Sequence, residues 1–369
     1  MRILIDYRSA LCHRTGAGEY AHQLARALSE AAAPDDSITV FSSSWKNRLT
    51  PTDLGPVDVV DRRIPNRVLN FLWHRAGWPP IEQLAGRVDI AHSFHPLLLP
   101  ARRAAQIVTI HDLDFLAHPE RTRAEIRRDY PVLVRSHANR ADRVIVSSRH
   151  MAGEVSRLLN VPKERIVQCP AGAPDWLPRS TPPPRGHILF LGTLEPRKNV
   201  GRLLDAYRAL LSERSDAPPL VLAGRATTLA EPWLQAIQRP PLSGRVKYLG
   251  YVPDSDRRAL YEQAVLLVLP SLDEGFGLTA LEAMTMGVPV VASDRGSLPE
   301  IIGDAGLLVS PERTEALAAA LGRVLSDGQV AHRLSEAGLA RSRQFSWRSS
   351  AQVLREAYRE AAEARAHRG

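Results

Sequence analysis

Residues 265–292 read VLLVLPSLDEGFGLTALEAMTMGVPVVA and hold the pattern that decides the fold. An apolar run ends at Pro270, a short acidic loop with Gly275 and Gly277 follows, and a helical stretch opens near Leu278. A second apolar run, PVVA, comes after that stretch. Runs that are apolar throughout, rather than alternating, are typical of parallel strands buried on both faces. The segment therefore predicts a strand–loop–helix–strand unit.

The alternation of strand and helix continues in both directions from this unit. Helical stretches, such as residues 19–32 and 199–213, separate further short apolar runs rich in β-branched side chains. The predicted strands are residues 2–6, 38–41, 88–91, 106–110, 143–147, 165–168, 187–191, 219–223, 245–249, 265–269, 289–292 and 306–309. Strands that alternate with helices in this way indicate an α/β fold with doubly wound parallel sheets.

A proline-rich stretch, PRSTPPPRG at residues 178–186, interrupts the alternation near the middle of the chain. Its four prolines cannot continue a helix or a central strand, and a new strand follows at once. A chain of 369 residues has room for two domains. We therefore predict two Rossmann-like domains facing across a cleft, where α/β folds bind ligands. The predicted boundaries are residues 1–178, a linker at 179–186, residues 187–345, and a polar C-terminal helix at 346–369 that packs back on the first domain.

The composition excludes several classes of protein. With 44% apolar and 24% charged residues, the chain resembles an ordinary globular protein rather than a disordered or fibrous one. No run of 18 apolar residues predicts a transmembrane helix, and the first residues, MRILIDYRSA, are not a secretory signal. We therefore expect a cytoplasmic protein. Cys12 and Cys169 form neither a disulfide framework nor a metal quartet.

The charge is basic, with a net value of +8, and arginine supplies most of it. Arginines crowd one part of the first half, at Arg102, Arg103, Arg121, Arg123, Arg127, Arg128 and Arg135. Two interpretations stay open, contact with an anionic membrane surface or acceptor, and a solvated helix face coated with arginine. Nucleic acid is not an expected partner, because neither a zinc-finger spacing nor an RNP-like aromatic motif is present.

Two glutamates follow the strand at 265–269. Glu274 lies in the loop, and Glu282 lies about one turn inside the next helix. The start of that helix, near Leu278, presents free N–H groups and a partial positive charge, which suit a phosphate. A carboxylate near such a helix start suits a ribose diol. The strand, glycine loop and helix together predict a nucleotide site at this edge of the sheet.

A second segment, HILFLGTLEPRKN at residues 187–199, places two cations after a strand. Arg197 and Lys198 directly precede a helix that Asn199 is expected to cap. Two cations at the carboxyl end of a strand suit a diphosphate. Lys198 is one of only four lysines among 48 basic residues, which favours a placed charge.

Two segments of the first half also follow strands. His111 and Asp112 come directly after residues 106–110, and in isolation the histidine is either a site residue or a hydrogen-bonding residue at the rim. Gly16, Ala17 and Gly18 begin like a GxGxxG fingerprint. Nine residues separate them from the first strand, however, and a nicotinamide site needs its glycines immediately after the strand. A mobile glycine loop over a ligand's phosphates fits better.

Other motifs of common catalytic sites are absent from the sequence. It contains no GxxxxGK[ST] phosphate loop, no GxSxG elbow and no HExxH or clustered His/Cys set for a metal. The remaining histidines, such as His74, His92, His95 and His150, are expected to be structural or on the surface.

The segment EGFGLTALE at 274–282 resembles the E-x7-E motif of the retaining glycosyltransferases of family 4, which have the GT-B fold. GTLEPRKN at 192–199 is similar to the diphosphate segment of that family. YLGYVPDSDRRALYEQA at 248–264 is similar to its base-binding strand and helix, and residues 287–311 to its closing segment. In the first half, RTGAGEY at 14–20 and TIHDLDFL at 109–116 resemble its acceptor-side loops.

The resemblance implies roles for the residues of the second half. Glu274 would contact the transferred sugar at the reaction centre, and Glu282 would hold the ribose. Arg197 and Lys198 would neutralise the departing diphosphate, helped by the backbone amides of Phe276, Gly277, Leu278 and Thr279. Val252 would meet the base through its backbone.

The resemblance also implies roles for the first half and contains one departure. His111 would approach the sugar from the first domain, and Gly16 to Gly18 would close over the phosphates. Many family members carry arginine directly after the glycine of the diphosphate segment, but here Thr193 stands at that position. We therefore expect Arg197 to take more of the phosphate charge.

The function implied is a retaining hexosyltransferase that needs no metal or other cofactor. It would move a sugar from a nucleotide-sugar donor to a glycan or lipid-linked acceptor, in cell-surface polysaccharide assembly at the inner face of the membrane. GTLEPRKN is similar to the segment of several mannosyltransferases, which makes GDP-mannose the first hypothesis and UDP-sugars the second. The alternatives are a sugar-nucleotide epimerase of the same fold, a non-catalytic sugar-nucleotide binding protein, and a nicotinamide oxidoreductase, against which the misplaced glycines count.

Overall fold

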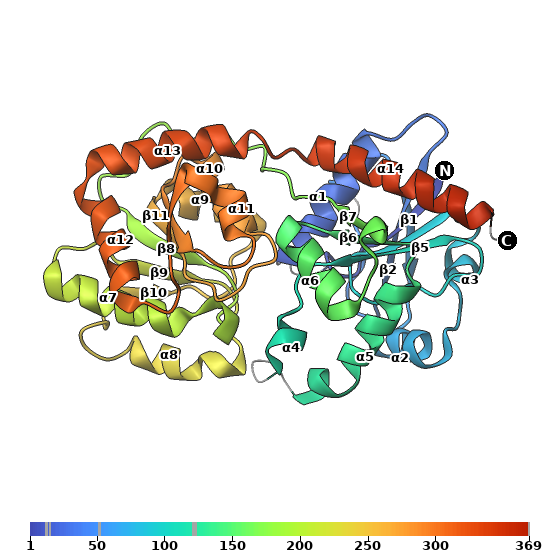
Figure 1. The fold of residues 1–369 in the computed structure, drawn as a ribbon, viewed down its shortest axis with the longest axis horizontal. Coiled ribbons are helices and arrows are strands. Elements are labelled where there is room, and N and C mark those ends of the chain that lie inside the picture. The colour runs from blue at the N-terminus through green and yellow to red at the C-terminus, as the bar shows by residue number, and fades with distance from the viewer. Residues whose placement is uncertain (12–13, 15, 51–52, 120–123, 368–369) are drawn as a thin grey trace. The chain divides into compact units, whose positions relative to one another are not determined.

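The computed structural model describes residues 1–11, 14, 16–50, 53–119 and 124–367. The chain forms two compact α/β units (Figure 1). Unit 1 comprises Met1–Gly172 and Ser346–Gly369, and unit 2 comprises Ala173–Phe345. Each unit is built on one sheet whose paired strands are all parallel. The predicted α/β class with parallel sheets is confirmed.

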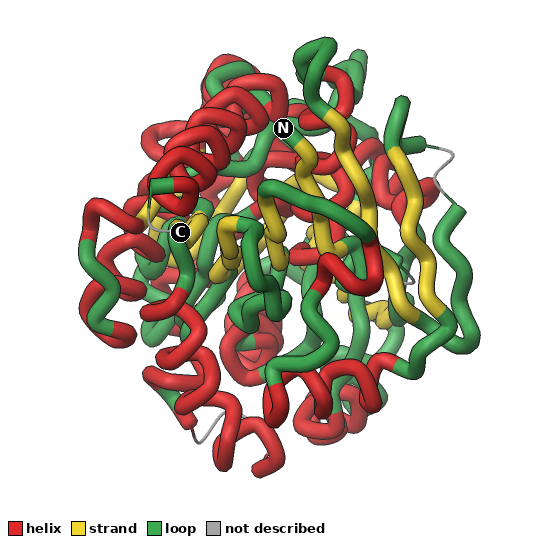
Figure 2. The backbone as a smooth tube through the Cα atoms, turned by 90° about the vertical axis from the view of Figure 1, so that its right-hand side faces the viewer, coloured by secondary structure: helices red, strands yellow, loops and turns green. Residues whose placement is uncertain are grey.

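The strands of unit 1 stand side by side, with helices packed around them (Figure 2). They are β1 (Arg2–Asp6), β2 (Ser37–Ser43), β3 (Asp58–Arg62), β4 (Ile90–Ser93), β5 (Ala105–Ile110), β6 (Arg143–Val146) and β7 (Ile166–Gln168). Their order in the sheet is β3-β2-β1-β4-β5-β6-β7. The helices are α1 (Gly16–Glu30), α2 (Asn66–Ala76), α3 (Ile81–Ala85), α4 (Asp114–Ala117), α5 (Ala124–Arg140), α6 (Arg149–Leu159) and α14 (Trp347–Ala366).

The strands of unit 1 follow the apolar runs of the sequence. All six residues of β5 are buried, as expected of a central parallel strand. The sheet also contains β3, which the sequence did not predict. Its residues, DVVDR, are exposed or only partly buried at the edge of the sheet, so a continuous apolar run is missing there.

Unit 2 has the strands β8 (His187–Leu191), β9 (Leu220–Ala223), β10 (Val246–Tyr248), β11 (Ala264–Leu269), β12 (Val290–Ser293) and β13 (Gly306–Val309). Their order is β10-β9-β8-β11-β12-β13, so β8 and β11 are neighbours. The helices are α7 (Val200–Glu213), α8 (Glu231–Ala236), α9 (Asp254–Glu262), α10 (Leu278–Thr285), α11 (Leu298–Ile302), α12 (Thr314–Ser326) and α13 (Gly328–Ser342). A 3-10 turn, η3 (Pro196–Lys198), precedes α7.

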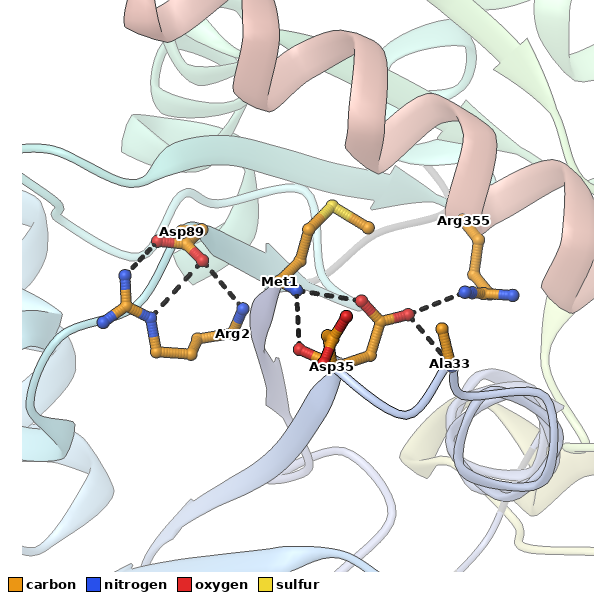
Figure 3. Close-up of polar contacts among 7 residues, drawn as sticks. Met1, Arg2, Ala33, Asp35, Asp89 and Arg355 are labelled. Carbon is orange, nitrogen blue, oxygen red and sulfur yellow. Dashed lines mark hydrogen bonds and ion pairs between the residues drawn. The ribbon is translucent and has the colours of Figure 1, made fainter.

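The C-terminal helix α14 belongs to unit 1 and packs against α1 (Figure 1). Arg355 of this helix donates a hydrogen bond to Oδ2 of Asp36 at 2.7 Å, and the Met1 amino group donates to Oδ1 at 2.9 Å (Figure 3). Burial tends to raise the pKa of Asp36, but these two bonds and one from the Ala33 N–H hold the pKa below its usual value. At the other face of the contact, the Tyr358 hydroxyl lies 2.6 Å from Nδ1 of the buried His92.

The passage between the units differs from the predicted linker. The chain enters unit 2 at Ala173, whose N–H donates to the carbonyl oxygen of Phe345 at 3.1 Å. The proline-rich stretch therefore belongs to unit 2, where the Arg179 guanidinium donates to the carbonyl oxygens of Ala264 and Gly287. Prolines prevent regular secondary structure, but they do not prevent a segment from packing on a sheet.

Within the described part of the chain, every helix is too short or too polar to span a bilayer.

Candidate functional site

A partly buried ion pair joins the segments that follow two neighbouring strands of unit 2. Lys198 comes after β8 and Glu274 comes after β11. Because the carboxyl ends of parallel neighbours lie at one edge of the sheet, the two segments meet. Nζ of Lys198 lies 2.5 Å from Oε2 of Glu274, and each side chain exposes only about one-seventh of its surface. The structure thus brings together two of the residues predicted from sequence.

Glu274 is held as a carboxylate by its neighbours. Burial tends to raise its pKa, but Lys198 and then Arg197 outweigh burial, and the pKa lies below its usual value. Arg197 contributes from a distance, since its Nη1 lies 3.9 Å from Oε2 of Glu274. Its closer contacts are the carboxylate of Glu195, at 2.9 Å, and the carbonyl oxygen of Asp273, at 3.1 Å. Lys198 is therefore the closer cation to Glu274, and Arg197 also braces the loop.

The backbone around Glu274 is fixed by two glycines. Gly277 adopts a positive φ of 102° and precedes α10, so the chain turns sharply into that helix. Gly296 has a φ of 63°, and a Cβ there would lie 2.5 Å from the Glu274 nitrogen. The N–H groups at the start of α10 have no carbonyl partner within the helix, as at any helix start. The loop thus presents a carboxylate beside the positive end of a helix.

Phe276 and Thr279 occupy different surroundings at the start of α10. The Phe276 ring is buried and packs edge-on against Phe345, with 5.9 Å between the ring centres. Its side chain is therefore structural, which leaves its backbone for the predicted phosphate contact. Leu278 and Thr279 are partly exposed.

Glu282 is already engaged by two side chains of α9. Arg257 donates to Oε1 at 2.9 Å, and the Tyr261 hydroxyl donates to Oε2 at 2.7 Å. Glu282 is 5% exposed, and burial and the adjacent carboxylate raise the pKa of Tyr261 well above its usual value. The sequence did not single out these two residues. Their spacing of four on one helix was the available signal.

Two further predictions concern the segments around these helices. Val252 lies between β10 and α9 and is partly exposed, with no strand or helix of its own. Asn199 stands at the position before α7, but its side chain does not cap that helix. It donates instead to the carbonyl oxygens of Pro270 and Pro311, because Asn199 adopts a left-handed backbone and turns its amide towards those loops.

In unit 1, His111 directly follows β5, and its ring packs edge-on against Tyr20 of α1 at 5.1 Å. Burial lowers the pKa of His111 to about 4, so the imidazole is neutral at physiological pH. Its Nε2 is buried and has no hydrogen-bond partner among the described residues. The ring nitrogen is thus available to a ligand hydroxyl.

Gly16, Ala17 and Gly18 form the first turn of α1, which corrects the expectation of a mobile loop. Gly18 lies close to the backbone of Ser9, because a Cβ there would lie 2.6 Å from the Ser9 carbonyl oxygen. Helical hydrogen bonds and this close packing hold the segment. The Tyr20 contact brings the first turns of α1 near His111.

The remaining residues that the sequence singled out lie outside the described part of the chain or on its surface. Arg121, Arg123 and Cys12 lie outside the described residues, as do the side chains of Arg127 and Arg128. Arg102, Arg103 and Arg135 are exposed. Among the described residues, no group of three or more His, Cys, Asp or Glu side chains is arranged to hold a metal ion.

Two family models match the two halves of the chain. Residues 14–175 match the model described as Glycosyltransferase Family 4, and residues 185–327 match that of Glycosyl transferases group 1. The chain is also 36% identical to the O-antigen chain mannosyltransferase B of Escherichia coli, over 94% of this chain and 96% of the relative. The chain belongs to glycosyltransferase family 4.

Solved structures share the GT-B fold of this glycosyltransferase. Sucrose-phosphate synthase from Thermosynechococcus elongatus is similar over 99% of this chain and 100% of its own, with a TM-score of 0.77 and 21% identity. Anabaena HepE in complex with UDP and glucose is similar over 96% and 98%, with a TM-score of 0.74 and 20% identity. The glycosyltransferase assignment excludes the nicotinamide oxidoreductase. In this glycosyltransferase, the E-x7-E glutamates thus have protein partners, Lys198 for Glu274 and Arg257 for Glu282.

Proposed function

We propose that this glycosyltransferase moves mannose from GDP-mannose to a glycan or lipid-linked acceptor, with retention of the anomeric configuration. The relative in Escherichia coli, an O-antigen chain mannosyltransferase, supports the sugar and a place in cell-surface polysaccharide assembly. The observation that carries the site is the partly buried pair of Lys198 and Glu274 beside the start of α10. A carboxylate and a cation at one strand edge suit a sugar that departs from a diphosphate.

The proposed reaction breaks the bond between the anomeric carbon and the diphosphate oxygen. The oxygen of an acceptor hydroxyl forms the new bond on the same face of the sugar, and its proton goes to the departing phosphate. Positive charge develops on the sugar and negative charge on the diphosphate. Glu274 would orient the sugar and stabilise its positive charge, while Lys198, Arg197 and the start of α10 would stabilise the diphosphate.

We propose that Lys198 changes partners when the donor binds. Without a donor, its ammonium group compensates Glu274 in a buried environment. A diphosphate would draw the ammonium group towards itself and leave Glu274 to the sugar hydroxyls. The pair would thus keep both groups charged until the donor replaces each partner.

We propose a role in the same transfer for His111 and for the first turn of α1. The neutral imidazole of His111 would form a hydrogen bond with a sugar hydroxyl through its unpartnered Nε2, as donor or as acceptor. The N–H groups of Gly16 to Gly18 would face phosphate oxygens, as helix starts favour anions. Glu282 would hold the ribose with its remaining lone pairs, and Val252 would meet the base.

We propose that the reaction needs no metal ion. Lys198, Arg197 and the helix start supply positive charge at the place where the diphosphate would depart. Transfer rates in EDTA and in magnesium should therefore agree within about two-fold. A rate that depends on added magnesium and is abolished by EDTA would contradict the proposal.

We also propose that unit 1 docks on an anionic membrane surface, from the cytoplasmic side. Val68 and Phe71 of α2, and Trp78 just after it, expose half or more of their surface, and exposed Arg67 and Arg75 lie on the same helix. Apolar side chains with flanking arginines suit an anionic interface. Cosedimentation with vesicles of phosphatidylglycerol should exceed that with phosphatidylcholine and fall in Phe71→Ser. Equal sedimentation with both lipids would overturn this docking.

The central experiment compares donors in a transfer assay. GDP-mannose, UDP-glucose and UDP-N-acetylglucosamine are each offered with a glycan acceptor, and the anomeric configuration of the product is read by NMR. Transfer from GDP-mannose with an α-linked product is expected. Transfer from a UDP-sugar but not from GDP-mannose would show that the donor is a UDP-sugar. Conversion of the donor without any acceptor would indicate an epimerase. Binding of GDP by a chain inactive under every condition would indicate a sugar-nucleotide binding protein.

A further inference from the structure

Unit 1 contains a cavity of about 390 Å³ that no predicted site residue lines. It lies at the carboxyl ends of β1 and β4, and α2 and α5 contribute the rest of its wall. All its lining residues belong to unit 1. The carboxyl end of a parallel sheet is where α/β folds bind ligands. The volume lies in the range of pockets that hold a small molecule such as a hexose.

Three buried polar atoms in this wall have no hydrogen-bond partner among the described residues. They are Oγ of Ser9, Oδ1 of Asn66 and Nδ1 of His74. An unsatisfied buried polar atom costs about 1–3 kcal/mol, and native proteins contain few of them. Three around one cavity therefore point to a ligand that supplies the missing hydrogen bonds.

One face of α2 supplies much of the wall. Asn66, Asn70 and His74 recur every fourth residue, so they lie on the same side of the helix. All three line the cavity. The sequence suggested that His74 and His95 are structural or on the surface, but both are lining residues. The four-residue spacing on α2 was the signal that the sequence offered.

The cavity wall carries no unpaired charge among its described residues. The guanidinium of Arg8 donates to both carboxylate oxygens of Asp6, at 2.8 and 2.7 Å, and to Oδ1 of Asn70 at 2.7 Å. It also stacks over the Trp73 ring, 4.6 Å from its centre. Burial, and then Arg8, lower the pKa of His74, so its ring is neutral at physiological pH. A phosphate in this cavity would find its one cation already neutralised.

Aromatic side chains complete the wall. Phe94 and Tyr130 line the cavity, and the Tyr130 hydroxyl lies 3.1 Å from Nε2 of His95. Pockets that combine apolar and aromatic surface with a few convergent hydrogen-bonding groups suit small polar molecules of defined shape. Hydroxyl groups, which both donate and accept, match a set of serine, amide and imidazole atoms.

We propose that this cavity binds one neutral sugar unit of the acceptor, so that the acceptor presents an uncharged hexose here rather than a phosphate. The assignment of this sugar to the acceptor rests on the proposed function, whereas the binding of a neutral sugar rests on the cavity alone. The hydroxyl groups of the sugar take Ser9, Asn66 and His74 as partners, and its apolar face lies against the aromatic side chains. The occupied cavity thereby satisfies all three orphaned atoms.

The test measures binding of simple probes to the full chain by saturation-transfer NMR, with GDP present to occupy the donor site. The neutral probes are the methyl α-glycosides of mannose, glucose, galactose and N-acetylglucosamine, and the charged probe is α-mannose 1-phosphate. At least one neutral glycoside should bind, and the phosphate ester should bind no more tightly. Asn66→Leu should weaken that binding about ten-fold, since it removes a hydrogen bond and leaves its partner unpaired.

Two variants keep the test independent of folding. Ser9→Ala removes one orphaned hydroxyl with little change in volume and should weaken the same glycoside. Asn47→Leu, at an exposed asparagine of unit 1 outside the cavity, should leave binding unchanged. The melting temperature and the GDP affinity of each variant are measured alongside.

The outcomes separate this proposal from the proposed function. If no glycoside binds, or if Asn66→Leu and Ser9→Ala leave binding intact, the cavity is not a sugar site. If mannose 1-phosphate binds at least ten-fold more tightly than every glycoside and loses that advantage in Asn66→Leu, the cavity is a phosphate site. The proposed donor instead fails when neither GDP binding nor transfer from GDP-mannose is observed, whatever the cavity binds.

Discussion

The two sites of the molecule treat their polar groups in opposite ways. In unit 2, Glu274 and Lys198 are charged, largely shielded from solvent and paired with each other at 2.5 Å. In unit 1, the atoms of Ser9, Asn66 and His74 around the cavity are neutral, buried and without partners among the described residues. One site is electrostatically complete before a ligand arrives, and the other is incomplete.

The difference follows from the cost of burying each kind of group. An unpaired buried charge costs several kcal/mol, so a site built from charges needs internal partners while it is empty. An unpaired neutral group costs about 1–3 kcal/mol, which a fold tolerates at a functional site. The comparison teaches that a site for an ionic ligand exchanges partners on binding, whereas a site for a neutral ligand gains them.

The largest effect is expected from Glu274→Gln. The amide keeps the shape of the side chain but removes the negative charge, so turnover should fall about 10²–10³-fold, the scale of losing one preorganised charge. The GDP affinity should change far less, because the diphosphate contacts are cations and backbone groups. Initial rates and calorimetry with GDP measure the two quantities. Glu262→Gln, at a partly exposed glutamate of α9, is the control. An equal loss of GDP affinity and turnover would show that Glu274 acts in donor binding.

Lys198→Ala should weaken GDP binding by about 10- to 100-fold, because a charge-assisted hydrogen bond contributes about 1.5–3 kcal/mol. It should also lower the melting temperature, since Glu274 loses its nearest cation. Lys247→Ala, at an exposed lysine of β10, is the control and should leave the GDP affinity unchanged. Calorimetry that returns the same GDP affinity for Lys198→Ala and the unchanged chain would remove Lys198 from the diphosphate site.

The pH profile sharpens the comparison further. The pKa of Glu274 lies below its usual value in the folded chain. The ionised carboxylate therefore stabilises the fold in full above the pKa that Glu274 has in the unfolded chain, and this stabilisation is lost as pH falls through the pKa of the folded chain. In Lys198→Met, the lowering influence of Lys198 on the pKa of Glu274 is gone and only those of Arg197 and Ser271 still oppose burial, so the pKa should rise. The acid limb of turnover should then move to higher pH. Glycoside binding in the cavity should not shift with it, because no group there pairs with Lys198. A limb that stays in place would assign the acid titration to another group.

The smallest effect is on stability in the absence of ligand. Asn66→Leu replaces an unsatisfied amide with an apolar side chain. The free energy of unfolding of the empty chain should therefore stay the same or rise by at most about 1 kcal/mol, and its melting temperature should not fall. Glu274→Gln, which breaks a satisfied pair, should lower it. Thermal unfolding of both variants gives the comparison directly. A clear destabilisation by Asn66→Leu would indicate that the amide has a structural partner.

The sequence predicted the sheets because their central strands are apolar throughout, as at β5 and β11. It missed β3, whose edge position leaves polar residues in the strand. It placed the linker by its prolines, although Arg179 ties that stretch to unit 2. Apolar periodicity reports burial along a strand, but it does not report which unit a loop packs against.

The site residues divide in the same way. Lys198 and Glu274 were predictable because both follow strands, and strand ends of one sheet meet. The partners of Glu282 were not predicted, because Arg257 and Tyr261 approach from a different helix. The cavity also escaped prediction, since its wall joins the end of β1 to one face of α2. Contacts between elements distant in sequence depend on tertiary packing, which a single sequence does not encode as a local pattern.

The hydrogen bond between Ala173 and Phe345 has a consequence for how such a chain is assembled and exchanged. The two ends of unit 2 lie together, so residues 173–345 form an insertion within unit 1 rather than a second half appended to it. A gene segment for that insertion is exchangeable as a cassette that leaves every strand of unit 1 in place. A stop codon after Phe345, by contrast, spares the cassette and removes α14. It uncovers α1, on which α14 packs, together with Asp36 and His92, the partners of Arg355 and Tyr358.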